Sequence, residues 1–195
     1  MSNETMTRPS PINQPTYSLT ARRFHWYTVA IVFIQIPLGF LTTYEGPAFK
    51  FSDVASGRLS SLHKLLGFIL LWLVVARLIY RFRHGAPPDE PSLATWQKGA
   101  SHATHWALYA LLIAVSMSGW IGISLYGARE LFGLVSLPAL TAVDQPLSDK
   151  VFEWHLRGAV LILLLLGAHI GAALYHHFLR KDGVLRRMWP NVDRT

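Results

Sequence analysis

Charged residues are absent from long stretches of the chain, and these stretches are predominantly apolar. No Asp, Glu, Lys or Arg occurs in residues 24–44, 99–128 and 158–179, which are runs of 21, 30 and 22 residues. A fourth apolar block is uncharged over residues 65–76 and continues past a single arginine, Arg77. Because about 20 apolar residues suffice to span the hydrocarbon core as a helix, the pattern predicts four transmembrane helices.

The four blocks predict an all-α fold, an integral membrane four-helix bundle. A soluble helical core would show charged outer faces along each helix, and these blocks lack them. We expect the bundle to occupy residues 21–190, after a polar tail of residues 1–20 that we expect to be disordered. The expected helices cover about residues 22–43, 60–83, 95–126 and 148–179. The longest loop contains LFGLVSLPAL, residues 131–140, which we expect on the outer membrane surface.

Positive charges are distributed unevenly between the two sides that this topology creates. Lysines and arginines number twelve on the side of the two termini and six on the other side. Because cytoplasmic loops carry the excess of these residues, we expect both termini in the cytoplasm. The net charge of +7 then reflects topology and lipid contact, so we expect no nucleic-acid partner.

Two features that the sequence lacks limit the classes of protein to which the chain can belong. The polar N-terminus has no apolar segment of the kind found in a cleavable signal, so the first apolar block is expected to be a membrane helix. There are no cysteines, which excludes disulfides, thiolate zinc sites and cysteine-ligated iron–sulfur clusters.

Nine histidines occur, and several fall inside the expected membrane helices. Ionisable residues within a membrane span are costly and point to function. His155 and His169 of the last helix are fourteen residues apart. This spacing leaves them about 40° apart around the helix and about 21 Å apart along it. The two side chains therefore lie on nearly one face, one near the outer surface and the other in the inner half.

Each of these histidines has a matching histidine at its own depth on another helix. The second helix enters from the outer side, so His63 lies level with His155, and the first enters from the inner side, so His25 lies nearer the level of His169. A lone interfacial histidine is more often a snorkelling polar residue, but two pairs matched in depth are not explained in that way. They suit two haems, one in each leaflet, with the four histidines as axial ligands of iron.

Basic and small residues near these histidines fit the same arrangement. Arg77 lies fourteen residues beyond His63, at the inner haem's depth, where we expect it to pair with a haem propionate; its simpler role is to end a tilted helix on the cytoplasmic side. We expect Lys64 and Arg157 to pair with a propionate of the outer haem in the same way. Glycines permit close approach to a porphyrin, although helix packing explains each one equally well. The glycines concerned are Gly39, Gly67, Gly119, Gly158, Gly167 and Gly171.

The other histidines have less specific interpretations. His102 and His105 are hydrogen-bond donors to a ligand, proton donors at a quinone site, or interfacial residues. His176 and His177 lie at the inner membrane boundary, where a structural role is at least as well supported as a catalytic one. His84 is expected to be a solvated loop residue.

At these positions the chain resembles the bacterial cytochrome b561 family, which includes superoxide oxidases. The resemblance covers about residues 17–188. The resemblance implies four spans, two haems b ligated by the residues His25, His63, His155 and His169, and ubiquinone as electron acceptor in the superoxide-oxidising members. The resemblance rests on FHW at residues 24–26, HKLLG at 63–67 followed by VARLIYRF, and EWH at 153–155. Its most specific part is the run AHIGAALYHHFLRKDGVLRRM at 168–188.

We therefore expect a membrane oxidoreductase, a superoxide:ubiquinone oxidoreductase, in which electrons enter at the outer haem and leave to ubiquinone. The outer positive charges of Lys64, Arg129 and Arg157 are expected to attract superoxide. The alternative is a non-enzymatic electron-transfer subunit that docks a periplasmic cytochrome or dehydrogenase. A histidine-lined metal-ion transporter is disfavoured, because the outer carboxylates lie at helix ends or in loops.

Overall fold

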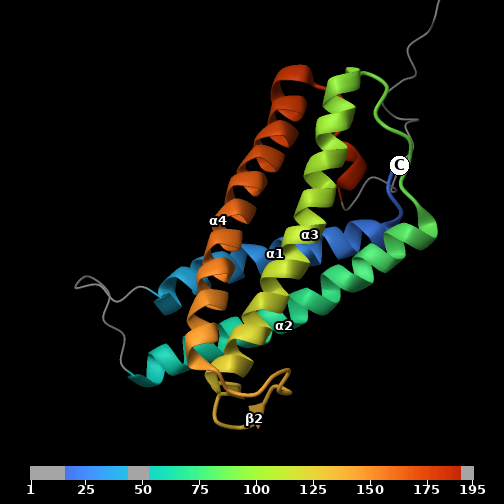
Figure 1. Cartoon of the computed structure of the whole chain (residues 1–195). Helices are drawn as coiled ribbons and strands as arrows, with labels where there is room; N and C mark the ends of the chain where they lie inside the picture. The colour runs from blue at the N-terminus through green and yellow to red at the C-terminus, as the bar shows by residue number, and fades with distance from the viewer. Residues whose placement is uncertain (1–15, 44–52, 190–195) are drawn as a thin grey trace, which may run out of the picture.

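The computed structural model describes residues 16–43 and 53–189, and four long helices account for most of them. They are α1 (Leu19–Thr43), α2 (Asp53–His84), α3 (Thr95–Tyr126) and α4 (Gln145–Tyr175). The helix contacts lie principally between consecutive helices. In Figure 1, α3 and α4 run side by side and cross the α1–α2 pair obliquely. The expected all-α, four-helix bundle is confirmed, and segments of all four helices are long and apolar enough to cross a membrane.

The helix bounds differ from expectation at the amino ends and at the carboxyl end of α4, which stops at Tyr175, four residues earlier than expected. α3 has the expected bounds, whereas α2 and α4 begin seven and three residues earlier than expected. α1 begins within the segment expected to be disordered, because Ser18 caps it. The Ser18 hydroxyl accepts from the Ala21 N–H at 3.2 Å, and its carbonyl accepts from the Arg22 N–H at 3.0 Å. The rest of the expected tail, residues 1–15, lies outside the described residues.

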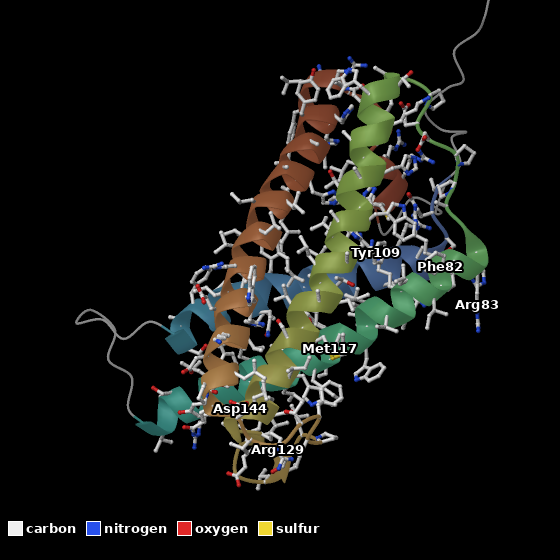
Figure 2. The ribbon with its side chains drawn as sticks, in the orientation of Figure 1. Phe82, Arg83, Tyr109, Met117, Arg129 and Asp144 are labelled. Carbon is white, nitrogen blue, oxygen red and sulfur yellow. The ribbon has the colours of Figure 1, made fainter. Side chains whose placement is uncertain are left out.

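The connection between α3 and α4 closes one end of the bundle, which we call the hairpin end. α3 stops at Gly127, whose φ of +90° favours glycine and whose N–H donates to the Ile123 carbonyl. α4 starts after Asp144, whose carboxylate accepts from the Leu147 N–H at 3.1 Å. Figure 2 shows Arg129 and Asp144 at this end of the molecule.

Between these caps, β1 (Glu130–Leu131) and β2 (Val135–Ser136) pair as a short antiparallel hairpin. The Phe132 N–H donates to the Ser61 hydroxyl of α2 at 3.0 Å, so the hairpin is held against the bundle. Leu134, at its turn, is 84% exposed. The expectation that this loop lies on the membrane surface stays a prediction.

An apolar layer from all four helices fills the middle of the bundle. Each of its central side chains is at most 8% exposed. Ile162 lies midway between His155 and His169 on α4, so this layer separates the two histidine levels. Close packing of this kind is a main source of helix association in a membrane, where lipid is as apolar as leucine. The central members are Val32, Leu70, Val74, Tyr109, Leu112 and Ile162.

The C-terminal segment closes the opposite end, which we call the terminal end. After α4, the π-helical turn η2 (His176–Arg180) and the 3-10 turn η3 (Arg186–Met188) lead the chain back toward α1. Trp26 Nε1 donates to the Met188 carbonyl at 2.8 Å, and the Arg22 guanidinium donates to the Trp189 carbonyl at 2.9 Å. Figure 1 shows the red C-terminal turn near the blue start of α1.

Candidate functional site

His63 of α2 and His155 of α4 face each other near the hairpin end, and we call them the hairpin-end pair. Their ring centroids are 6.1 Å apart and their ring planes are inclined by 82°. Both side chains are half-buried. The structure thus brings together two histidines that are 92 positions apart, in the pairing that helix direction predicted.

His25 of α1 and His169 of α4 form the corresponding terminal-end pair. Their ring centroids are 6.4 Å apart, with an angle of 71° between the ring planes. Both are half-buried. The structure therefore brings all four predicted ligands into two pairs, and α4 contributes one member to each pair.

The separation within each pair suits one metal ion between two imidazoles. Two metal–nitrogen bonds of about 2 Å, with the radii of two imidazole rings, place the ring centroids about 6 Å apart. The observed separations are 6.1 and 6.4 Å. Neutral imidazole nitrogens are also the axial donors that haem iron takes. Both pairs thus fit bis-histidine ligation of a haem.

A cavity of about 490 Å³ surrounds the hairpin-end pair. Its volume lies in the range of cofactor and ligand sites in proteins, roughly 300–1,000 Å³. His63 and His155 both line it, together with Gly39, Gly67 and Gly119 from three different helices. The walls are largely apolar, which suits the face of a porphyrin.

Two of the predicted glycines pack directly against ligand rings. A Cβ atom added at Gly39 would lie 2.9 Å from Cε1 of His63, and one at Gly119 would lie 3.0 Å from Cε1 of His155. Real Cβ atoms essentially never approach below 3.0 Å and seldom below 3.4 Å. The absence of a side chain at these positions therefore makes room for the rings.

The other predicted glycines have different neighbours. A Cβ at Gly67 would lie 3.0 Å from the Gln35 amide nitrogen, and one at Gly158 would meet Val115, which indicates contact between α3 and α4. A Cβ at Gly167 or Gly171 would meet nothing within 4 Å. Helix packing thus explains Gly158, and no packing in the described residues explains the two glycines that bracket His169.

Hydrogen bonds fix the orientation and the tautomer of His155. Its Nδ1 lies 2.9 Å from the Val115 carbonyl oxygen and 3.2 Å from the Ser118 hydroxyl. A carbonyl oxygen only accepts, so Nδ1 carries the proton and Nε2 keeps its lone pair. A metal-binding histidine commonly donates its second N–H in this way. Sequence reasoning missed Ser118 and Val115, because a backbone partner leaves no residue-type signal.

Gln35 is a second residue at this site that sequence reasoning missed. Its amide nitrogen donates to the backbone carbonyl of His63 at 2.9 Å, and its side chain lines the cavity. This bond joins α1 to α2 at the level of the hairpin-end pair. A polar residue within an uncharged span was the available signal.

Arg77 reaches the terminal-end pair, as its spacing predicted. Its Nη2 lies 3.1 Å from Nδ1 of His25, and its guanidinium lies over the Tyr109 ring, 5.2 Å from the centroid. Figure 2 shows Tyr109 near the middle of α3. Arginine only donates, so Nδ1 of His25 accepts in this arrangement. A neutral His25 can therefore bind a metal through Nε2 only when Arg77 turns to another acceptor.

The basic residues expected near the other pair mostly have protein partners. Lys64 Nζ donates to the carbonyls of Ala128 at 3.1 Å and Glu130 at 2.7 Å, although it still lines the cavity. Arg157 is exposed and forms an ion pair with Glu153 one turn earlier. The expected role of Arg157 at the site therefore finds no support in its contacts, because its side chain follows the surface of its own helix.

Arg129, the third basic residue expected on the outer side, also has a protein partner. Its Nη1 donates to the Leu137 carbonyl at 2.8 Å, which stabilises the loop after the hairpin. Lys64 is therefore the one of these three residues that lines the cavity.

Most of the remaining histidines serve local structure. His102 contacts Asp89 at 3.1 Å and is exposed, and His84 stacks on the Tyr80 ring at 4.0 Å. His176 is buried and contacts the Asp182 carboxylate at 2.6 Å, whereas His177 is exposed. His105 differs from these, because its ring packs against His169.

Comparison with known proteins agrees with this geometry. The family described as "Prokaryotic cytochrome b561" matches residues 16–191. The chain is 31% identical over 177 residues to "Cytochrome b561 homolog 2" of Escherichia coli K12, covering 88% of this chain and 90% of that protein. It is 30% identical over 179 residues to "Probable superoxide oxidase CybB" of Yersinia pestis, covering 89% and 96%.

Proposed function

Since the chain belongs to the prokaryotic cytochrome b561 family, whose members are haem b proteins that transfer electrons in bacterial membranes, we propose that it is a superoxide:ubiquinone oxidoreductase. The observation that carries this proposal is the stack of two histidine pairs along α4, with ring separations of 6.1 and 6.4 Å. We propose that His63 and His155 hold one haem b and that His25 and His169 hold a second.

The spacing of the pairs suits transfer across a bilayer. Fourteen residues of helix rise by about 21 Å, which is most of the hydrocarbon thickness of about 30 Å. The excess of lysine and arginine at the terminal end supports an orientation with that end in the cytoplasm and the hairpin end in the periplasm of a bacterial inner membrane. The hairpin-end pair would then lie near the outer surface.

Bound haem supplies reversible one-electron oxidation and reduction of iron. His63 with His155, and His25 with His169, would each hold one haem, and two histidine ligands favour electron transfer without binding of oxygen. The protein would fix the four imidazoles and exclude water with apolar walls. Arg77 would turn from His25 toward a haem propionate, because guanidinium donors pair well with a carboxylate. Lys64, which lines the cavity, supplies a positive charge that attracts a small anion.

The proposed reaction balances in electrons and protons. Two superoxide anions each lose one electron and become two molecules of oxygen. One ubiquinone gains the two electrons and two protons and becomes ubiquinol. The similarity to a probable superoxide oxidase supports this choice of donor.

The test is reduction of a soluble ubiquinone by superoxide. Purified protein is supplied with an enzymatic superoxide source, and quinone reduction is followed against buffer and against heat-treated protein. We expect a clear acceleration. Lys64→Gln should lower the rate about two- to tenfold and flatten its dependence on salt, because steering by charge is screened by ions. Arg157→Gln is the matched control and should change the rate little.

Two outcomes would contradict the proposal at different levels. Unaccelerated quinone reduction by a protein that contains two haems removes superoxide oxidation and leaves the electron-transfer role. Retention of two haems b in His169→Ala or His63→Ala removes the proposed ligand pairs themselves.

A further inference from the structure

His105 makes a contact that the proposed function leaves unexplained. It lies on α3, is half-buried, and its ring centroid is 5.3 Å from that of His169. The His25 ring also lies near His169, with 6.4 Å between the ring centroids. Three imidazoles therefore meet at the terminal-end site, and a haem iron has two axial positions.

Distance decides which histidine is the second ligand. An iron between two imidazoles requires ring centroids about 6 Å apart, as two metal–nitrogen bonds of about 2 Å dictate. A direct N–H···N hydrogen bond of about 3 Å places the centroids about 5 Å apart. The 6.4 Å of His25 matches the first value, and the 5.3 Å of His105 matches the second. His105 is therefore too close to His169 to share an iron with it.

The antiparallel pairing of α3 with α4 explains why His105 is found there. Gly119 abuts the His155 ring and lies fourteen residues from His105, just as His155 lies fourteen residues from His169. One face of α3 thus places Gly119 against the His155 ring and His105 against the His169 ring. At the first ring the Val115 carbonyl faces Nδ1, 2.9 Å away. His105 occupies the corresponding place beside the His169 ring.

We propose, on the basis of the proposed ligand pairs, that His105 is a positioning residue that accepts a hydrogen bond from Nδ1–H of His169. Terminal ring torsions are soft, so rotation at this separation forms the bond. Nδ1 of His105 lies 3.4 Å from the Ser101 hydroxyl. With Nδ1–H of His105 donating to Ser101, its Nε2 is free to accept from His169, and His169 Nε2 is free to bind iron.

This bond has an electronic consequence. An acceptor on the distal nitrogen makes an axial imidazole more electron-rich and fixes its orientation. Electron-rich ligands stabilise the oxidised iron, so the bond lowers the reduction potential of the terminal-end haem. The hairpin-end haem, whose ligand His155 uses a backbone carbonyl, does not depend on His105.

The test compares substitutions of similar size at His105 with a control on the same helix. His105→Leu removes the acceptor, and His105→Gln keeps an oxygen that accepts. His102→Leu is the control, because His102 is exposed and contacts Asp89. Haem content, the low-spin electron paramagnetic resonance signals and the two reduction potentials are measured for each protein.

We expect all three variants to retain two haems. His105→Leu should raise the potential of one haem and shift its resonance signal, His105→Gln should restore both toward the parent values, and His102→Leu should change neither. Unchanged potentials in His105→Leu overturn the inference, and so does loss of a haem in His105→Gln, which would make His105 a ligand. His25→Ala and His169→Ala separately report on the ligand pairs: if each loses one haem while the His105 variants match the parent, only this inference fails.

Discussion

At the scale of single residues, the site depends on what lies beside each imidazole. His155 is oriented by a backbone carbonyl, the Arg77 guanidinium contacts His25, and glycines leave space for the two rings of the hairpin-end pair. Residue type alone indicated the imidazoles and the glycines, because polar and very small residues stand out in an apolar span. The carbonyl had no such signal, because every residue carries one.

Replacing Gly119 tests the space beside His155. Gly119→Val places a branched side chain where a single Cβ would already lie 3.0 Å from the His155 ring, so the ring must move from the position in which it faces His63. We expect the purified protein to fall from two haems to one, as measured by pyridine haemochrome absorbance per polypeptide. Gly57→Val is the control, because a Cβ at Gly57 meets nothing within 4 Å. Two haems with unchanged spectra in Gly119→Val would show that the close contact is unimportant.

At the scale of elements, α4 organises the molecule. It supplies one histidine to each pair, and its C-terminus continues into turns that close the terminal end. There His176 and Asp182 form a contact of 2.6 Å between side chains that are 9% and 8% exposed. Lys181 between them has a φ of +52°, so the contact holds the chain in a conformation that non-glycine residues seldom adopt. The pair thus has a structural role.

Removing this contact should loosen the terminal end. Asp182→Ala leaves the buried His176 without its partner, which we expect to cost about 1–3 kcal/mol and to lower the thermal unfolding midpoint in detergent. Asp182→Asn keeps an accepting oxygen and should lose less. Glu153→Gln, which breaks an exposed pair with Arg157, should cost no more than about 0.5 kcal/mol. Equal shifts for Asp182→Ala and Glu153→Gln would show that burial adds nothing.

At the scale of the whole molecule, the two ends differ in composition and structure. The terminal end gathers the C-terminal turns and most of the basic residues, and the hairpin end carries an uncharged loop over residues 131–143. Electron transfer across a membrane needs such a difference, because donor and acceptor approach from different sides. On the positive-inside rule, we propose that the terminal end faces the cytoplasm.

The absence of cysteine allows a direct test of this orientation. Single cysteines are introduced as Ala86→Cys between α2 and α3 and Thr141→Cys after the hairpin, both at exposed positions. A membrane-impermeant maleimide applied to cells with a permeabilised outer membrane should label Thr141→Cys. Ala86→Cys should be labelled only after the inner membrane is also opened. The reverse pattern would invert the proposed topology.

The sequence by itself determined the four spans and the relative depth of each histidine, and it predicted the direction of the spans. These properties follow from apolar run length, basic residues and the fixed rise of a helix, none of which requires knowledge of contacts. The expected pairs of His63 with His155 and of His25 with His169 needed no more than this, and the structure brings both together.

Only the tertiary structure decided which partner each polar side chain takes. Lys64 binds carbonyls of the hairpin, Arg157 binds Glu153, and His105 lies against His169. These contacts depend on the rotation of each helix about its own axis and on the path of the loops, which packing among all four helices sets jointly. Sequence spacing places a residue at a depth, but rotation and packing decide which neighbour its side chain meets.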